Sequence, residues 1–83
     1  MKNEPKPQTE DIQRITSAEQ LAGLLRKSRK SQKITIEKLA QFADLSRDAI
    51  LKFENNKTDI RISNLLKLLN LCNIELLIRT NKK

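Results

Sequence analysis

The chain has 83 residues and a net charge of +7, with 17 Lys and Arg against 10 Asp and Glu, no histidine and one cysteine. A chain this short forms one domain at most and buries only about 60% of its unfolded surface, so we expect a second copy to complete its core. The lack of histidine, of a glycine-rich phosphate loop and of clustered carboxylates argues against an enzyme, a metal site or a cofactor.

Charge is distributed unevenly along the chain. From residue 21 onward there are 14 Lys and Arg against 6 Asp and Glu, a net charge of +8. A positive field of this size favours nucleic acid or an acidic partner, although basic surfaces also serve solubility alone. Leucine and isoleucine supply most of the apolar volume, which predicts an all-helical protein.

Sorting signals and disulfides are not indicated by the sequence. The first residues are polar, and no apolar run approaches the roughly 18 residues that span a bilayer. The only cysteine, Cys72, lies in an apolar helical pattern, which excludes a disulfide framework within one chain. We therefore expect a reduced, cytoplasmic setting close to the genome.

The first 15 residues have low hydrophobicity, two prolines and mixed charge, which predicts a flexible arm. A more specific hypothesis gives this arm a contact of its own. Lys2 or Lys6 would then reach a DNA minor groove, or Ile12 and Ile15 would dock on a partner.

The first predicted helix begins at Thr16 or Ser17 and ends near Ser31. Ser17 followed by Gln20 has the spacing of a capping box. Glycine inside a helix costs roughly 1 kcal/mol relative to alanine. Gly23 therefore indicates either close packing of another element at that point or a helix that simply tolerates this cost. The expected inner face consists of Leu21, Ala22, Leu24, Leu25 and Ser28. Five basic residues gather near its end, where their charges can interact favourably with the helix C-terminus, contact phosphates, or do both. They are Arg26, Lys27, Arg29, Lys30 and Lys33.

Residues 35–56 predict two short helices joined by a tight turn. Thr35 is the expected N-cap of the first, whose apolar residues recur at helical spacing. Asp44 tolerates the left-handed backbone that the turn requires, and Ser46 caps the second helix. The second helix is predicted from Arg47 to about Glu54.

The second of these helices has a basic outer face. Its expected inward residues are Ala49, Ile50 and Phe53, and its expected outward residues are Arg47, Asp48, Leu51 and Lys52. A short helix that exposes Arg and Lys directly after a capped turn suits the DNA major groove.

A last helix is predicted to start at Asp59 or Ser63. Its apolar residues lie on more than one side, so part of its surface needs cover, which a second copy can supply. These residues are Ile62, Leu65, Leu66, Leu68, Leu69 and Cys72.

From residue 74 to residue 80 the pattern changes to the alternation of a strand. No other strand is predicted in the chain, so we expect antiparallel pairing with the same segment of a second subunit across a two-fold axis. The alternative is that residues 74–79 continue the last helix. Residues 81–83 are expected to be a loose tail.

The motifs "LLRKSRK", "ITIEKLAQFADLS" and "AILKFENN" resemble those of the phage-repressor-like (XRE) helix-turn-helix proteins. Within that group, "KFENN" followed by "SNLLKLLNLCNIELLIR" looks most like the HipB antitoxins. The resemblance implies an all-α fold, a four-helix phage-repressor-like domain at residues 16–73. It also implies a C-terminal dimerisation strand at residues 74–80 that forms a lid over the dimer.

The resemblance also implies roles for individual residues. Arg29 and Glu54 match a buried structural ion pair. The positions that meet base edges are Arg47, Asp48 and Lys52, with the alternative that Asp48 instead holds Arg47 or Lys52 in place. The expected phosphate contacts are Thr35, Lys33, Lys38, Ser46, Asn55, Asn56 and Lys57. The expected dimer contacts are Leu69, Ile74, Leu76, Leu77 and Ile78.

Two positions depart from the pattern of many relatives. Ile36 replaces a glutamine at the start of the first of the paired helices, and it can neither donate to a phosphate nor support a base contact. Asp44 replaces a glycine in the turn and is sterically tolerable there.

The function implied by the resemblance is that of a DNA-binding antitoxin. Such a protein represses its own operon as a homodimer on a palindromic operator. It also neutralises a HipA-type serine/threonine kinase toxin, with or without a third small component. The alternatives are a free-standing XRE repressor with no toxin partner, and an interaction protein whose DNA binding is weak.

Overall fold

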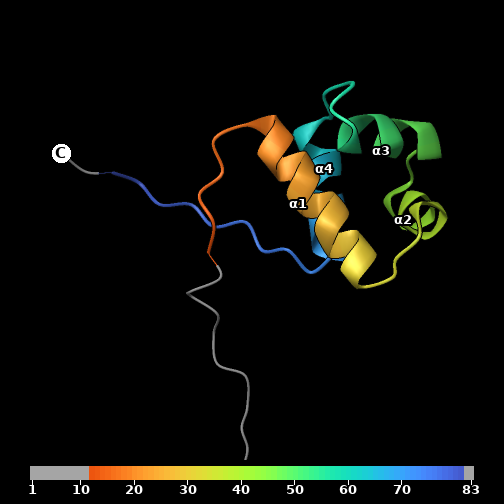
Figure 1. Cartoon of the computed structure of the whole chain (residues 1–83), viewed down its shortest axis with the longest axis horizontal. Helices are drawn as coiled ribbons and strands as arrows, with labels where there is room; N and C mark the ends of the chain where they lie inside the picture. The colour runs from red at the N-terminus through yellow and green to blue at the C-terminus, as the bar shows by residue number, and fades with distance from the viewer. Residues whose placement is uncertain (1–11, 82–83) are drawn as a thin grey trace, which may run out of the picture.

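The structure is a computed structural model that describes residues 12–81, and within them it contains four helices (Figure 1). They are α1 (Ala18–Ser31), α2 (Ile36–Ala43), α3 (Arg47–Glu54) and α4 (Ile62–Leu71). Helix α3 packs against both α1 and α2, and α2 also packs against α4. The proposed groove contacts of Lys2 and Lys6 lie outside the described residues, as do residues 82–83 of the tail.

The first three helices begin where the sequence predicts. Ser17, Thr35 and Ser46 each accept a hydrogen bond from the backbone N–H three residues further on, at 3.1, 3.0 and 3.0 Å. Each bond satisfies one of the N–H groups that a helix N-terminus leaves without an intrahelical partner.

Helix α4 begins differently from the prediction. Its N-cap is Arg61, which makes no side-chain capping bond, so the predicted start at Asp59 or Ser63 is wrong. Ile60, the residue before the cap, packs against the core. Tertiary packing therefore sets the entry into α4, where the sequence offers no capping side chain at the right place.

All four helices end in the same way. A residue with positive φ follows each one: Lys33 at 59°, Asp44 at 58°, Asn56 at 60° and Asn73 at 60°. The N–H of the residue after each donates to a carbonyl five residues back, at 3.0, 3.0, 2.8 and 2.9 Å. These are Schellman endings, which satisfy carbonyl groups at the end of the helix. The left-handed conformation predicted for Asp44 is confirmed.

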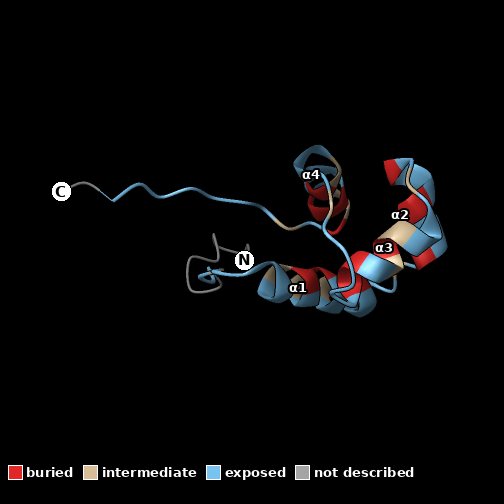
Figure 2. Ribbon diagram, turned by 90° about the horizontal axis from the view of Figure 1, so that it is seen from above, coloured by how far each residue is buried: buried red, intermediate tan, exposed pale blue. Residues whose placement is uncertain are grey.

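The core is made of the faces that the four helices turn toward one another (Figure 2). Its members are Ala22, Leu25, Ile36, Leu39, Ala40, Ala43, Ile50, Phe53, Leu65, Leu68, Leu69 and Cys72. Burial raises the pKa of the Cys72 thiol, which keeps it protonated. The prediction of close packing at Gly23 is wrong for residues 12–81, because a Cβ at this position would meet no atom of them within 4 Å.

The segment after α4 leaves the four helices without regular secondary structure (Figure 1). The alternative in which the last helix continues through residue 79 is wrong, since α4 ends at Leu71. The Gln32 side chain links the ends of α1 and α4: its Nε2 donates to the Cys72 carbonyl at 2.7 Å, and its Oε1 accepts from Asn73 Nδ2 at 2.6 Å. These two bonds fix the point from which the segment departs. Its pairing with a second copy stays a prediction.

Candidate DNA-binding site

Helices α2 and α3 form a helix-turn-helix unit. The turn between them consists of Asp44 in the left-handed conformation, Leu45 partly buried against the core, and the capping residue Ser46. Leu45 N–H donates to the Ala40 carbonyl at 3.0 Å, which closes the end of α2. The turn is therefore short and well anchored, and it presents the N-terminal end of α3 at the surface.

The residues predicted to meet base edges are all exposed on α3. The side chains of Arg47, Asp48 and Lys52 retain 56%, 72% and 56% of their accessible surface. Ile50 and Phe53 face the core, as predicted. Leu51, which was expected to point outward, is instead partly buried against the core. Because α3 packs between α1 and α2, its inner face is wider than a one-sided helical pattern predicts.

Two ion pairs lie on this exposed surface. Asp48 Oδ2 is 3.2 Å from Lys52 Nζ, one helical turn further along α3. Glu37 Oε2 on α2 is 2.9 Å from Arg47 Nε on α3. Of the alternatives for Asp48, the structure contains the pairing with Lys52. Sequence reasoning missed Glu37, because its partner lies ten residues away on another helix and no local pattern marks the pair.

The seven residues predicted to contact phosphates are exposed as well. They come from the segment around the start of α2 (Lys33, Thr35, Lys38), the cap of α3 (Ser46) and the residues just after α3 (Asn55, Asn56, Lys57). Thr35 and Ser46 accept capping bonds through their hydroxyl oxygens, so their O–H groups remain able to donate. Donors at both ends of a recognition helix are suited to fixing its register on a duplex.

A buried ion pair holds α3 against α1. Arg29 Nε donates to Glu54 Oε2 at 2.8 Å, and Arg29 Nη2 donates to Glu54 Oε1 at 3.0 Å. A third bond runs from Arg29 Nη1 to the Ile34 carbonyl at 3.0 Å. The bond to Glu54 raises the pKa of the Arg29 guanidinium. The two side chains are 9% and 2% exposed, so the pair is part of the scaffold that orients α3.

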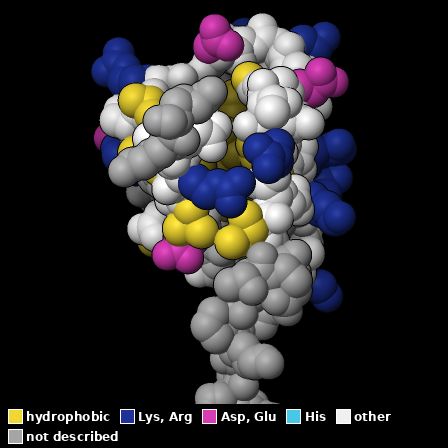
Figure 3. Space-filling view, turned by 90° about the vertical axis from the view of Figure 1, so that its left-hand side faces the viewer, with side chains coloured by type: hydrophobic (Ala, Val, Ile, Leu, Met, Phe, Trp, Pro, Cys, Tyr) yellow, Lys and Arg dark blue, Asp and Glu magenta, His cyan; other side chains and the backbone are white. Residues whose placement is uncertain are grey.

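The residues predicted to form the dimer contact fall into two groups. Leu76, Leu77 and Ile78 are exposed, and Ile74 packs partly against the core. Leu69 is only 1% exposed and lies inside the core of its own chain. On the side from which the C-terminal segment leaves, Figure 3 shows hydrophobic side chains grouped around a Lys or Arg side chain.

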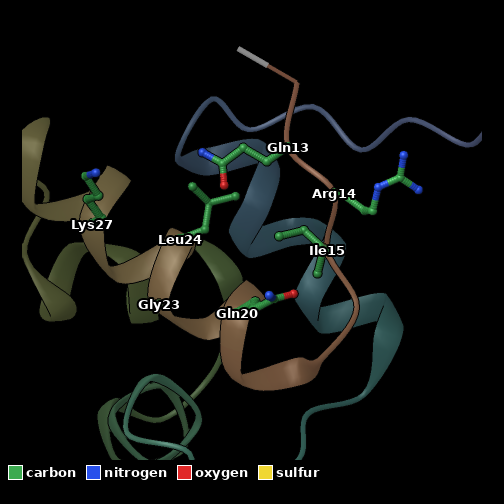
Figure 4. Close-up of a pocket in the computed structure, with 7 residues that line it drawn as sticks. All are labelled: Gln13, Arg14, Ile15, Gln20, Gly23, Leu24 and Lys27. Carbon is green, nitrogen blue, oxygen red and sulfur yellow. The ribbon is translucent and has the colours of Figure 1, made fainter. Parts of the chain in front are cut away.

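A surface hollow lies elsewhere, between the segment before α1 and the part of that helix from Gln20 to Lys27 (Figure 4). Ile15 and Leu24 line it, while the Arg14 side chain points away from it. Lys27, one of the basic residues of α1 for which a phosphate contact is an alternative, also lines it, whereas the residues predicted to meet base edges do not. Within residues 12–81, no helix is long and apolar enough to cross a membrane.

These features define a class of protein. A capped helix-turn-helix unit, a basic exposed face on its second helix and a buried ion pair behind that helix are what a DNA-binding domain needs to place side chains in a major groove.

The comparisons with known proteins give the family. The Helix-turn-helix family matches residues 25–78, which is more than half of the chain, and the chain belongs to this family. No curated protein sequence matches it. Two similar solved structures, "MDT Protein" and "Structure of HipA-HipB-O2-O3 complex", each have 25% identity, a TM-score of 0.75 and coverage of 86% of this chain and 100% of theirs.

A further similar structure, "HipB-O1-O2 complex", has 25% identity, a TM-score of 0.74 and coverage of 83% of this chain and 100% of its own. The match to the family and these neighbours agree with one another. The chain is an XRE-type, HipB-like DNA-binding protein, and the resemblance stated from its sequence is confirmed.

Proposed function

We propose that the chain is an antitoxin that represses its own toxin–antitoxin operon as a homodimer. The observation that carries the proposal is the exposed face of α3, where Arg47 and Lys52 stand at the surface of a capped helix-turn-helix unit. In this proposal two copies of α3 enter successive major grooves of a palindromic operator, and the phosphate-contacting residues fix their register. Such a dimer would act in the cytoplasm, beside the genome.

Exposed apolar residues support the dimer. On α4, Ile62 and Leu66 remain 62% and 46% exposed, and the C-terminal segment adds Leu76, Leu77 and Ile78. Residues 12–81 of one copy leave them uncovered. An extended segment also needs partners for its backbone N–H and C=O groups. Antiparallel pairing of residues 74–80 with the same residues of a second copy would meet both needs at once.

The proposed second partner is a HipA-like serine/threonine kinase toxin, with or without a third small component. One similar structure is described as a "HipA-HipB-O2-O3 complex", and this chain covers the whole of the matched chain. That similarity supports simultaneous binding of a toxin and an operator. The proposal gives the chain itself no catalytic activity.

The DNA part of the proposal is tested on the duplex upstream of the chain's own gene. We expect Arg47→Ala to weaken binding to this duplex by about 1 to 3 kcal/mol and to lower the preference over unrelated DNA, as loss of a base contact does. Lys67→Ala is the matched control, because it removes one positive charge from the exposed side of α4. Fluorescence anisotropy with equal losses for both variants would reject a base contact by Arg47.

The toxin part needs a separate experiment. A HipA-like kinase encoded beside this gene is expressed alone, together with the parent chain, and together with Arg47→Ala. We expect both forms of the chain to relieve growth arrest, because neutralisation of the toxin is independent of base recognition. Failure of both to relieve arrest, with operator binding retained by the parent, would favour a free-standing repressor.

A further inference from the structure

The ion pair between Glu37 and Arg47 joins the two helices of the DNA-binding unit. Glu37 lies in the first turn of α2, and Arg47 is the first residue of α3. The distance from Glu37 Oε2 to Arg47 Nε is 2.9 Å, with both side chains more than half exposed. An isolated surface pair of this kind contributes little to stability, so stability alone does not account for the arrangement.

The position of Arg47 is unfavourable for the helix itself. The N-terminus of a helix carries a partial positive charge, which favours acidic residues and disfavours cations. Asp48, the next residue, has the favourable charge for this place, and it also forms the i, i+4 pair with Lys52. The positive charge of Arg47 is thus unfavourable beside the partial positive charge of the N-terminus of α3. This is the end of the helix that meets base edges in a helix-turn-helix complex.

The contact with Glu37 leaves part of the guanidinium available. The nearest approach of the carboxylate is to Arg47 Nε, at 2.9 Å, and among residues 12–81 neither Nη1 nor Nη2 of Arg47 donates a hydrogen bond. Two nitrogens at the end of a planar fork match the O6 and N7 acceptors that guanine presents in the major groove. A long side chain that is already held in place loses less rotamer freedom on binding than one that is free.

We propose that Glu37 is a positioning residue that holds Arg47 for a guanine in each half-site of the operator; this inference rests on the proposed DNA-binding function. A carboxylate close to DNA is repelled by phosphates, so Glu37 lowers affinity for duplexes of every sequence. Its benefit is that it orients Arg47, and this raises the affinity only for duplexes that have the preferred base at the contacted position. Removal of its charge therefore has two effects of opposite sign.

The experiment begins with a duplex library randomised over the binding region, from which the parent chain selects its preferred sequence. Dissociation constants are then measured on this duplex, on its single-base variants and on an unrelated duplex. The variants are Glu37→Gln, Arg47→Ala and the two combined. Glu19→Gln is the control, because it makes the same change of charge at an exposed residue in the first turn of α1.

We expect Glu37→Gln to bind the unrelated duplex more tightly and to lose about fivefold or more of the preference for guanine at one position of each half-site. The control keeps the parent's preference. In the Arg47→Ala background, Glu37→Gln is expected to leave the base preference unchanged, which is the coupling that a double-mutant cycle detects. Glu37 is exposed, so circular dichroism should give the same fold for every variant of it.

A Glu37→Gln chain that retains the parent's guanine preference would overturn the inference while leaving the proposed function intact. The same loss of preference in the presence and absence of the Arg47 side chain would overturn it too, because Glu37 would then act independently of Arg47. A parent chain that selects no sequence would overturn the proposed function and this inference with it.

Discussion

Removal of the Glu54 carboxylate is the perturbation whose effect the structure defines best. Glu54→Ala leaves the Arg29 guanidinium, only 9% exposed, without the two bonds of 2.8 and 3.0 Å that now satisfy it. Removing one partner of a buried ion pair costs about 3–5 kcal/mol. A domain of 83 residues has a stability of roughly 4–12 kcal/mol, at about 0.05–0.15 kcal/mol per residue. The variant should therefore lose between about a quarter and all of its stability.

The assay is urea unfolding followed by far-UV circular dichroism. All variants are measured at one chain concentration, because the stability of a dimer depends on concentration. The control Glu19→Ala removes an exposed glutamate from the first turn of α1 and should lower the free energy of unfolding by no more than about 1 kcal/mol, the usual contribution of an acidic side chain at that place. The double variant Arg29→Met with Glu54→Leu replaces both charges by apolar side chains.

The double variant distinguishes the cost of an unpaired charge from the value of the pair. We expect it to lie close to the parent, apart from about 1 kcal/mol for the Ile34 carbonyl, which loses the bond from Arg29 Nη1. A Glu54→Ala chain as stable as the parent would refute the reasoning. So would a double variant as unstable as the single one.

Three further predictions concern DNA affinity, helix stability and assembly. Lys57→Ala should weaken binding to duplexes of every sequence and reduce the slope of log affinity against log salt concentration by about one. Lys67→Ala should leave this slope unchanged, and equal slopes for the parent and Lys57→Ala would count against a phosphate contact. Gly23→Ala should raise the free energy of unfolding by about 0.5–1 kcal/mol, because the new Cβ meets open space; a drop in the urea midpoint would point to a neighbour at this position. Deletion of residues 74–83 should give monomer or aggregate in sedimentation measurements, since Leu76, Leu77 and Ile78 are lost from the proposed interface; a stable dimer would disprove the role of this segment.

Local signals made most of the helix boundaries predictable. Ser17, Thr35 and Ser46 cap their helices with their own side chains, so the sequence contains the information for these starts. The left-handed conformation of Asp44 is likewise predictable from its residue type, because aspartate tolerates a positive φ. Arg61 has no such signal, and the start of α4 depends on packing of Ile60 against the core.

The candidate site was predictable only in part, because some of its features depend on how the helices pack and not on local sequence. The exposure of Arg47 and Lys52 follows from helical periodicity within α3. The pairing of Arg47 with Glu37 depends on how α2 and α3 cross, and that angle is set by the core. Leu51 was misplaced because periodicity assumes one buried side, whereas α3 has neighbours on two helices.

The central claim is that two copies of the chain place their α3 helices in successive major grooves of one duplex. Hydroxyl-radical footprinting of the duplex bound by the parent chain tests it most directly. The account predicts two protected regions related by a two-fold axis, with centres about 10–10.5 base pairs apart. A single protected region, or two regions out of step with the helical repeat, would contradict it.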